Sequence, residues 1–504
     1  MSFAVHVFRN ARGSLSARLR GVISTQYSNT ELPYLSNFRA TSTLQSTRQD
    51  DKHPVTELWP RAVVKQVPYV EPKTPEVDGK KPPLKLRDAL VAYKSRSVAE
   101  LLRAVTVFQT CKFRWLVKNA EPVLAAANSV SKTLTNFAVK KTFFAQFCAG
   151  ETEDEVKPVM QGLYNNRVGS ILDYAAEADL SSVPNPGVHG NAYLQKTEDH
   201  CNLNLNKYLQ AISLATHVTK GAGVVAMKVT SLGNPFLLER MSAVPRDELT
   251  AEERSLVERL EERMNLLGQC AQNAGVRLLV DAEQSYFQPA IDELALMMMK
   301  NWNKEESVVF NTYQCYLKDA YGKLAAHLEA SDREGFSLGA KLVRGAYMKM
   351  ERQRAAERGY PSPIHDTIED THECFDSSVS LMLEQVKRQR GQVVIASHNE
   401  NSILRAMEEM ERLGISSQNP GVMFGQLQGM CDYLTYSLGA RGYHAYKYLP
   451  YGPLNEVMPY LIRRAQENGD VLATTDMEKY LMLAEVKRRM HAALYPSHKA
   501  IAAA

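Results

Sequence analysis

The chain has 504 residues, 44% of them apolar and 23% charged, and its formal net charge is only +4. This composition allows a sizeable core, excludes a chain that is disordered as a whole, and gives no reason to expect a nucleic-acid partner. Seven cysteines without a C-x-x-C pair indicate reduced thiols, not a disulfide framework or a zinc site, and the absence of an apolar run of about 18 residues predicts no transmembrane helix.

The first thirty residues have the composition of a mitochondrial transit peptide. They contain Arg9, Arg12, Arg18 and Arg20, several serines, and no acidic residue before Glu31. Transit peptides are arginine-rich, serine-rich and poor in acids, whereas a secretory signal needs a longer apolar centre. We therefore predict a transit peptide over residues 1–30, with a disordered basic tail as the alternative.

Two segments of different composition follow, over residues 31–85 and 86–150. Residues 31–85 are polar and rich in proline, which predicts a linker or irregular segment. Over residues 86–150, apolar side chains recur at intervals of three and four, which predicts a helical N-terminal region.

From residue 151 to about residue 475, short apolar runs alternate with long helical stretches. Uninterrupted apolar runs are typical of parallel strands that are buried on both faces. Eight such strands separated by helices predict an α/β fold, a (βα)8 TIM-type barrel. The predicted strands lie near Ile171, Val225, Leu279, Phe310, Val343, Val394, Phe424 and Tyr446.

Two further helical stretches accompany the predicted barrel. Residues 231–276 are longer than a minimal crossover and indicate an insertion, in which Thr250 and Glu253 have the spacing of a capping box and Gly275 predicts a helix end. Residues 476–504 contain an amphipathic pattern that predicts a C-terminal helix packed on the barrel.

Polar side chains gather at the predicted strand ends, where barrels of this class carry their functional residues. Taken singly, each of these residues is better explained as a surface residue or a hydrogen-bonded core residue than as a functional one. Arg463 and Glu467, for example, could form an ion pair on a solvated helix face. Their common location favours a site, and its cations favour an anionic ligand or a cofactor with phosphates. The residues are Lys228, Asp281, Glu283, Gln314, Lys341, Arg344, His398, Asn399, Gln426, Tyr448, Arg463, Arg464, Glu467 and Asn468.

Several common catalytic motifs are absent from the sequence. It contains no H-E-x-x-H, no G-x-S-x-G elbow, no P-loop and no G-x-G-x-x-G fingerprint. These absences argue against a zinc protease, an α/β-hydrolase and a dinucleotide fold of the Rossmann type, and no metal site is predicted.

The segments KLVRGAYM, ASHNENS, FGQLQGM, YLPYGP and YLIRRAQENG resemble, in this order, the signature segments of the proline dehydrogenase family. MKVTSLG and LLVDAEQSY resemble its earlier strands, and the basic N-terminus and the insertion resemble the animal mitochondrial form. The resemblance covers roughly residues 150 to 475. It implies a distorted (βα)8 barrel that binds FAD and oxidises L-proline to Δ1-pyrroline-5-carboxylate, the first step of proline degradation to glutamate. A hydride would pass from proline C5 to flavin N5, and the electrons on to a quinone at the matrix side of the mitochondrial inner membrane, with which the protein would associate peripherally.

The resemblance also assigns site residues. It implies that Arg463 and Arg464 clamp the proline carboxylate, which Lys228 also faces, and that Leu342, Tyr448 and Tyr460 wall the proline ring. Lys341 departs from the arginine of bacterial relatives, so its positive charge is kept and the planar fork is lost. The residues at positions that line FAD are Asp281, Gln314, Lys341, Val343, Gly345, Ala346, Tyr347, Ser397, His398, Asn399, Gln426, Arg464 and Glu467.

Three other functions stay open at this point. A hydroxyproline dehydrogenase is a close relative, and the ring-contacting residues would decide between the two. Lys228 at a strand end could instead be the Schiff-base lysine of a lyase, which needs no flavin. A barrel without activity, serving as a binding scaffold, is the third alternative.

Overall fold

The structure, a computed structural model, describes residues 86–175, 191–219, 222–470 and 472–494. The chain divides into two compact units, residues 1–56 and 57–504, and all described residues belong to the second unit. The predicted transit peptide and the predicted linker lie outside the described residues.

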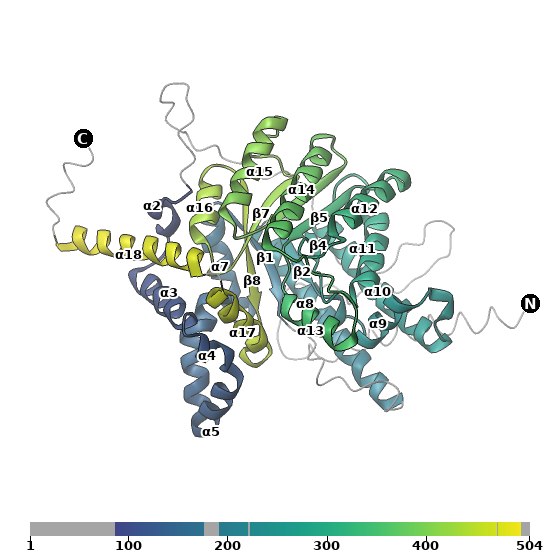
Figure 1. Ribbon diagram of the computed structural model, residues 1–504, viewed down its shortest axis with the longest axis horizontal. Helices are drawn as coiled ribbons and strands as arrows, with labels where there is room; N and C mark the ends of the chain where they lie inside the picture. Colours follow the sequence, from purple (N-terminus) through teal and green to yellow (C-terminus); the bar gives the residue numbers. More distant parts are fainter. Residues whose placement is uncertain (1–85, 176–190, 220–221, 471, 495–504) are drawn as a thin grey trace, which may run out of the picture. The chain divides into compact units, whose positions relative to one another are not determined.

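Eight parallel strands close into a barrel in the order of the sequence (Figure 1). All eight predicted strands are confirmed, and β1 pairs with β8 along seven residues to close the barrel. The strands are β1 (Val168–Tyr174), β2 (Val224–Met227), β3 (Arg277–Val280), β4 (Val309–Gln314), β5 (Leu338–Val343), β6 (Gly391–Ala396), β7 (Val422–Leu427) and β8 (His444–Tyr451).

Helices connect each strand to the next. The main connections are α8 (Asn191–Thr219), α10 (Ala251–Ala274), α11 (Gln288–Trp302), α12 (Ala320–Glu334), α14 (Ile368–Lys387), α15 (Glu400–Leu413) and α16 (Asp432–Ala440). Additional elements are the 3₁₀ turns η4 (Val229–Ser231) and η5 (Arg246–Glu248) and the helices α9 (Pro235–Ala243) and α13 (Met348–Arg358). The predicted capping box at Thr250 and Glu253 opens α10, and Gly275 ends it in the left-handed conformation.

The barrel is distorted at the place where the eighth helix would lie. α7 (Glu153–Asn165), which precedes β1, packs against β1 and α8. The helix that follows β8, α17 (Leu454–Asp470), instead packs mainly against the N-terminal helices. These are α2 (Ala89–Tyr93), α3 (Val98–Cys111), α4 (Arg114–Lys118), α5 (Ala120–Val139), the π-helix η2 (Lys140–Phe144) and α6 (Ala145–Phe147), followed at the other end of the chain by α18 (Leu472–Leu494).

A buried ion cluster joins the N-terminal helical region to the barrel. The Asp432 carboxylate lies 2.5 Å from Arg96 Nη2 and 2.8 Å from Lys447 Nζ, and its side chain is inaccessible to solvent. Glu478 of α18 accepts hydrogen bonds from the backbone N–H groups of Cys431 and Asp432 at the start of α16. Burial, together with the charge of Asp432, raises the pKa of Glu478 to about 7. One cluster thus holds the start of α3, α16, β8 and α18 together.

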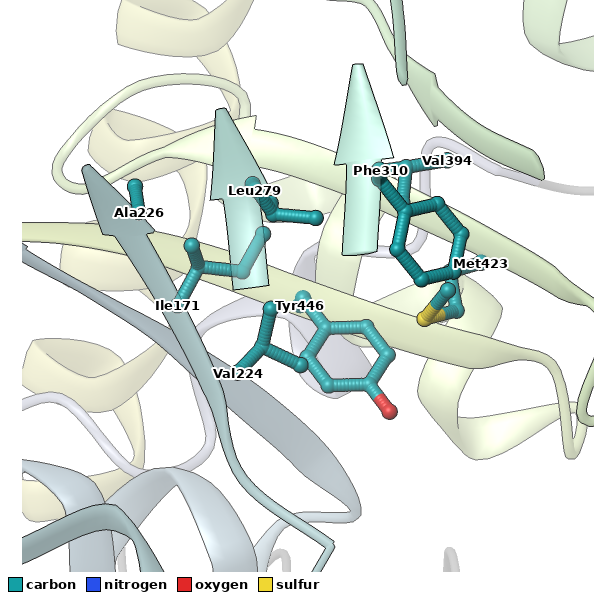
Figure 2. Packing of buried hydrophobic residues seen from close by; sticks show 8 residues of the cluster. All are labelled: Ile171, Val224, Ala226, Leu279, Phe310, Val394, Met423 and Tyr446. Atoms are coloured by element: carbon teal, nitrogen blue, oxygen red, sulfur yellow. The ribbon is translucent and has the colours of Figure 1, made fainter. Parts of the chain in front are cut away.

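The interior of the barrel is packed by one or two side chains from almost every strand (Figure 2). The cluster comprises Ile171, Val224, Ala226, Leu279, Phe310, Val394, Met423 and Tyr446. Its two rings need glycine on the neighbouring strand. A Cβ at Gly169 would lie 2.3 Å from the Tyr446 ring, and one at Gly339 would lie 2.3 Å from the carbonyl oxygen of Val309 and 2.9 Å from Phe310. Large and small side chains therefore alternate across β1–β8 and β4–β5.

The packing predicts opposite effects for two glycine-to-alanine substitutions. Gly339→Ala should destabilise the protein by about 1–3 kcal/mol or more, because its nearest neighbour is backbone that cannot rotate away. Gly322→Ala on α12, where no atom lies within 4 Å of the new Cβ, should stabilise it by about 0.5–1 kcal/mol. Denaturant midpoints would measure both, and equal midpoints for the two variants would contradict the packing account.

Candidate functional site

A cavity of about 550 Å³ lies at the carboxyl ends of the strands. Its volume is in the range of small-molecule sites, and the topology places it where barrels of this class carry their active sites. All but one of the residues assigned from the sequence line it, contributed by the strand ends, the loops after them and α17. They are Lys228, Asp281, Gln314, Lys341, Val343, Gly345, Ala346, Tyr347, Ser397, His398, Asn399, Gln426, Tyr448, Tyr460, Arg463, Arg464 and Glu467.

Leu342 is the exception among the assigned residues. Its neighbours on β5, Lys341 and Val343, line the cavity, and successive side chains of a strand point to opposite faces. Leu342 is therefore turned toward the surrounding helices, where it is fully buried. The expectation that Leu342 walls a substrate ring does not fit this placement.

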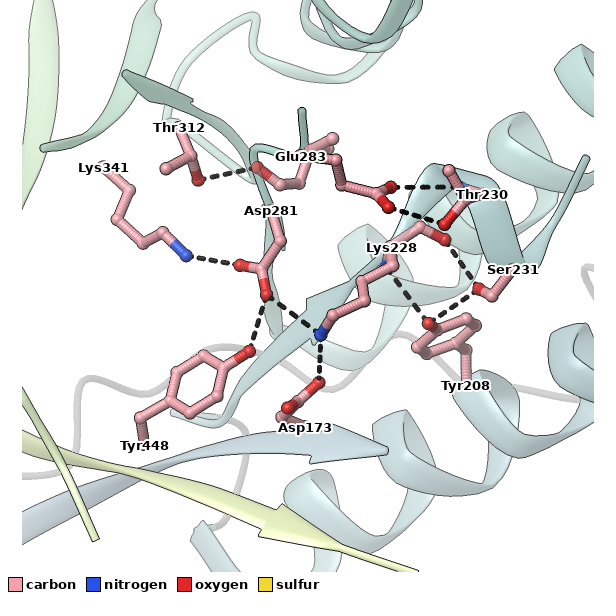
Figure 3. Close-up of polar contacts among 11 residues, drawn as sticks. Asp173, Tyr208, Lys228, Thr230, Ser231, Asp281, Glu283, Thr312, Lys341 and Tyr448 are labelled. Carbon is pink, nitrogen blue, oxygen red and sulfur yellow. Dashed lines mark hydrogen bonds and ion pairs between the residues drawn. The ribbon is translucent and has the colours of Figure 1, made fainter. Parts of the chain in front are cut away.

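Asp281 is the centre of the polar network at the strand ends (Figure 3). Its Oδ2 accepts a hydrogen bond of 2.6 Å from the Tyr448 hydroxyl and lies 3.5 Å from Lys228 Nζ. Its Oδ1 forms an ion pair with Lys341. The ammonium group of Lys341 also lies 5.6 Å from the centre of the Tyr448 ring. One carboxylate thus connects side chains from β5, from β8 and from the residue after β2.

The charges around Asp281 determine its ionisation. Burial alone raises the pKa of a carboxyl group, but Lys341, Lys228 and the Tyr448 hydroxyl together hold the pKa of Asp281 below its usual range. Burial and the neighbouring carboxylates of Asp173 and Asp281 raise the pKa of Tyr448 well above its usual value. At neutral pH the site therefore contains an ionised Asp281 and a Tyr448 that keeps its proton.

Lys228 is positioned by its backbone as well as by its side chain. Its N–H donates to the Tyr208 hydroxyl at 3.1 Å, and its carbonyl accepts from Ser231 Oγ at 2.6 Å. The hydroxyl oxygens of Tyr208 and Ser231 are hydrogen-bonded to each other at 2.9 Å. At the other end of the side chain, Lys228 Nζ lies 3.3 Å from Asp173 Oδ1. The lysine is therefore fixed between α8 and the barrel mouth.

Asp173 was not identified from the sequence. It lies near the end of β1, is buried, and lines the cavity. The available signal was a carboxylate within an apolar strand, two residues after Ile171 and so on the same inward face. Glu283, a strand-end candidate, has a different role: its carboxylate accepts from the N–H and the hydroxyl of Thr230.

Arg344, a strand-end candidate from the sequence to which the family resemblance gave no role, lines the cavity directly after β5. Its guanidinium donates to His372 Nδ1 at 3.0 Å, to Ser397 Oγ at 2.8 Å and to Ser402 Oγ at 2.9 Å. The same group lies 4.4 Å from the centre of the Phe375 ring. These contacts tie β5 to α14 and to the loop after β6.

His398 is held as a neutral imidazole. Its Nε2 accepts a 3.0 Å hydrogen bond from the N–H of Leu427, so the ring proton is assigned to Nδ1. Burial, with the charges of Lys447, Arg464 and Arg344, lowers the pKa of His398 to about 3. The loop after β6 therefore offers a donor, not a second cation, beside the cavity.

α17 supplies the cations above the cavity. Arg464 forms an ion pair with Glu467, three residues on, and lies 4.8 Å from the centre of the Tyr460 ring. The Tyr460 hydroxyl and Arg464 Nε are buried and have no hydrogen-bond partner among the described residues. Because buried polar groups are normally paired, these two atoms suit a polar ligand in the cavity.

The loop after β5 depends on one glycine. Gly345 has φ 132°, and a Cβ there would lie 2.5 Å from the Tyr316 ring. Any other residue would be strained and would meet that ring. The segment from Gly345 to Tyr347 therefore runs along the cavity, with its backbone close to any ligand.

Comparisons with known proteins agree with this arrangement. A family model described as proline dehydrogenase matches residues 157–477. Proline dehydrogenase 1, mitochondrial, from Drosophila melanogaster is 32% identical over 80% of this chain and 80% of its own, and the protein of that name from Homo sapiens is 31% identical over 84% and 91%. Hydroxyproline dehydrogenase from Xenopus laevis is 33% identical over 79% and 89%.

Among solved structures, proline utilization A from Bdellovibrio bacteriovorus superposes with a TM-score of 0.57 at 20% identity. The match covers 76% of this chain and 38% of that longer chain. At this identity the likeness supports the barrel fold alone.

The low pKa of His398 predicts an acid-sensitive contribution to stability. Between its ordinary value of 6.5 and about 3, the unfolded chain binds a proton that the folded chain does not. Folded stability should therefore fall as the pH decreases below 6.5, by up to about 1.4 kcal/mol per pH unit from this group. His398→Gln should reduce that slope, which thermal unfolding at a series of pH values would measure. His200→Gln, at an exposed position on α8, controls for the loss of an imidazole as such. An unchanged slope in His398→Gln would contradict the prediction.

Proposed function

The chain belongs to the proline dehydrogenase family, and from the site that its barrel builds we propose that it oxidises L-proline to Δ1-pyrroline-5-carboxylate with FAD as the cofactor. The observation that carries the proposal is the meeting, in one cavity, of two adjacent arginines on α17 with the Lys228–Asp281–Tyr448 network. A carboxylate bound by the arginines would place the rest of a small amino acid over that network.

The substrate is recognised through its carboxylate and its ring. Arg463 and Arg464 bind the carboxylate, since planar guanidinium groups suit bidentate contacts, and Lys228 adds a third positive charge. Tyr448 and Tyr460 wall the ring, because both are aromatic residues that line the cavity, Tyr448 partly buried and Tyr460 buried. The Tyr448 ring is held in place by its hydroxyl bond to Asp281.

The remaining lining fits a large, partly anionic cofactor. Lys341, His398, Gln426 and the backbone around Gly345 offer donors, and the unpartnered Arg464 Nε lies in the same cavity. FAD would be held by the residues assigned to it from the sequence, all of which line the cavity, and when bound it would supply the acceptor for the hydride from proline C5. The protein orients the substrate and provides fixed positive charge, so proximity and electrostatics are its contribution.

Hydroxyproline is the second candidate substrate. Two relatives, from Xenopus laevis and Bos taurus, are named hydroxyproline dehydrogenase and are each 33% identical to this chain. A lyase that forms a Schiff base on Lys228 fits the site less well. Such a lysine reacts as the neutral amine, whereas carboxylates at 3.3 and 3.5 Å favour the ammonium form.

We further propose that the protein is imported into mitochondria, lies on the matrix side of the inner membrane, and passes its electrons to a quinone. The proposal is supported by the basic, acid-free first thirty residues and by the relatives named mitochondrial. In the part of the chain that the structure describes, no helix is long and apolar enough to cross a membrane. As the family resemblance implies, we propose that the membrane association is peripheral.

The visible spectrum of the purified protein tests the proposal. Flavin bands that bleach when L-proline is added without oxygen, and bleach less with trans-4-hydroxy-L-proline, are the expected outcome. Stronger bleaching by hydroxyproline would assign the relative's activity. A protein without flavin even after reconstitution with FAD would overturn the proposal.

Substitution of a clamp arginine should weaken substrate binding. Arg463→Gln should raise the L-proline concentration for half-maximal bleaching by roughly 10- to 100-fold, because a charge-assisted hydrogen bond contributes about 1.5–3 kcal/mol. Arg333→Gln on α12, at an exposed position, is the matched control and should leave that concentration unchanged. Equal concentrations for Arg463→Gln and the wild type would remove Arg463 from the carboxylate site.

A further inference from the structure

The segment from Lys112 to Lys141 contains α4 and α5 and exposes large apolar side chains to solvent. Exposed fractions are 71% for Trp115, 88% for Val130 and 66% for Leu134, and Phe113 and Phe137 are also exposed. None of the twenty residues of α5 is buried. In Figure 1, α4 and α5 extend away from the barrel. We call this segment the basic hairpin.

Two of the exposed apolar side chains lie beside a break within α5. α5 is interrupted at Ser131, whose φ of −161° and ψ of 104° are not helical. Ser131 Oγ accepts a hydrogen bond from the N–H of Leu134 and so caps the second half of the helix. Val130 and Leu134 flank this break, and each half of α5 is too short to cross a hydrocarbon layer of about 30 Å.

The basic hairpin has a positive net charge. Residues 112–141 contain six basic side chains and a single acidic one, Glu121. Lys112 pairs with Asp476, and Lys140 pairs with Glu151 and Glu155. The other four, Arg114, Lys118, Lys132 and Lys141, form no ion pair with any residue in the described ranges. The exposed apolar side chains are thus accompanied by four basic side chains that no acidic residue in the described ranges neutralises.

From this combination we infer that the basic hairpin docks the protein on an anionic membrane surface. Exposed Trp, Phe and Leu beside Lys and Arg are typical of segments that lie in the headgroup region, where the rings enter the interface and the cations meet lipid phosphates. A second copy of the chain is the less suitable occupant, because two such surfaces would bring like charges together.

The position of the basic hairpin gives docking a consequence for the site. α4 and α5 pack against α17, which contributes Tyr460, Arg463, Arg464 and Glu467 to the cavity. A membrane bound at the basic hairpin would therefore contact helices that pack directly on α17, the helix that borders the cavity. This inference names a surface for the membrane association proposed above, but binding to lipid does not depend on the dehydrogenase activity.

Flotation of the flavin-loaded full chain with vesicles tests the inference. Vesicles of phosphatidylcholine and phosphatidylglycerol in equal parts are compared with vesicles of phosphatidylcholine alone. One variant, the apolar variant, removes exposed apolar side chains (Trp115→Ser, Val130→Ser, Leu134→Ser), and another removes charge (Arg114→Gln, Lys118→Gln, Lys132→Gln, Lys141→Gln). All proteins keep the same basic N-terminus, so any difference belongs to the basic hairpin. Matched controls at exposed positions elsewhere are Tyr321→Ser on α12 and Lys304→Gln with Arg358→Gln.

The wild type and the controls should bind the anionic vesicles, and the wild type should bind phosphatidylcholine weakly. Each charge removed should weaken binding by about fivefold, which corresponds to about 1 kcal/mol per basic residue near an anionic surface. The apolar variant should lose binding while L-proline still bleaches its flavin in solution. Vesicles with brominated acyl chains should quench part of the tryptophan fluorescence of the wild type. The variant Trp115→Phe should lack this quenched component.

Three results would overturn the inference. One is equal vesicle binding by the wild type and both hairpin variants, and another is failure of the wild type to bind anionic vesicles. The third is a wild-type oligomer that the apolar variant dissociates without any effect on lipid binding, which would assign the surface to contacts between copies. Loss of flavin bleaching in every protein, with vesicle binding as expected, would contradict the proposed activity and leave this inference standing.

Discussion

Mutual neutralisation of buried charges is the constraint on which the rest of the site depends. Lys228 and Lys341 are both buried at the carboxyl end of the barrel, where a lone ammonium group would be strongly disfavoured. Asp173 and Asp281 are buried beside them, and Asp281 contacts both lysines. These four residues come from or directly follow four different strands, so their charges are compensated only when β1, β2, β3 and β5 assemble. Fold and site are in this sense stabilised together.

The interior below this layer shows why the charges meet where they do. Gly169 and Gly339 accommodate the rings of Tyr446 and Phe310, so the middle of the barrel is filled by apolar side chains. Polar side chains at the next inward positions then have space only at the carboxyl end, where the cavity begins. Every second residue of a strand points into the barrel, so successive inward positions form first the packed core and then the polar end at the cavity.

The displaced helix α17 links the periphery of the molecule to the cavity. Because α7 packs on β1 and α8, α17 can lie against the N-terminal helices and direct its arginines into the site. The ion cluster of Arg96, Asp432 and Lys447 anchors those helices to the barrel. The N-terminal helices therefore support the substrate side of the site while their outer surface stays available for other contacts.

The sequence by itself determined the eight strands, since parallel strands buried on both faces appear as unbroken apolar runs. It also identified most of the residues that line the cavity, because functional side chains follow strand ends in this fold and short motifs such as the adjacent arginines are specific. Only the tertiary structure decided three further points. Leu342 points away from the cavity because it is one residue from Lys341 and so lies on the other face of β5. Asp173 enters the site because β1 pairs with β2, which places it beside Lys228. The exchange of places between α7 and α17, and the exposure of the basic hairpin, depend on contacts between segments far apart in the chain, which no local pattern encodes.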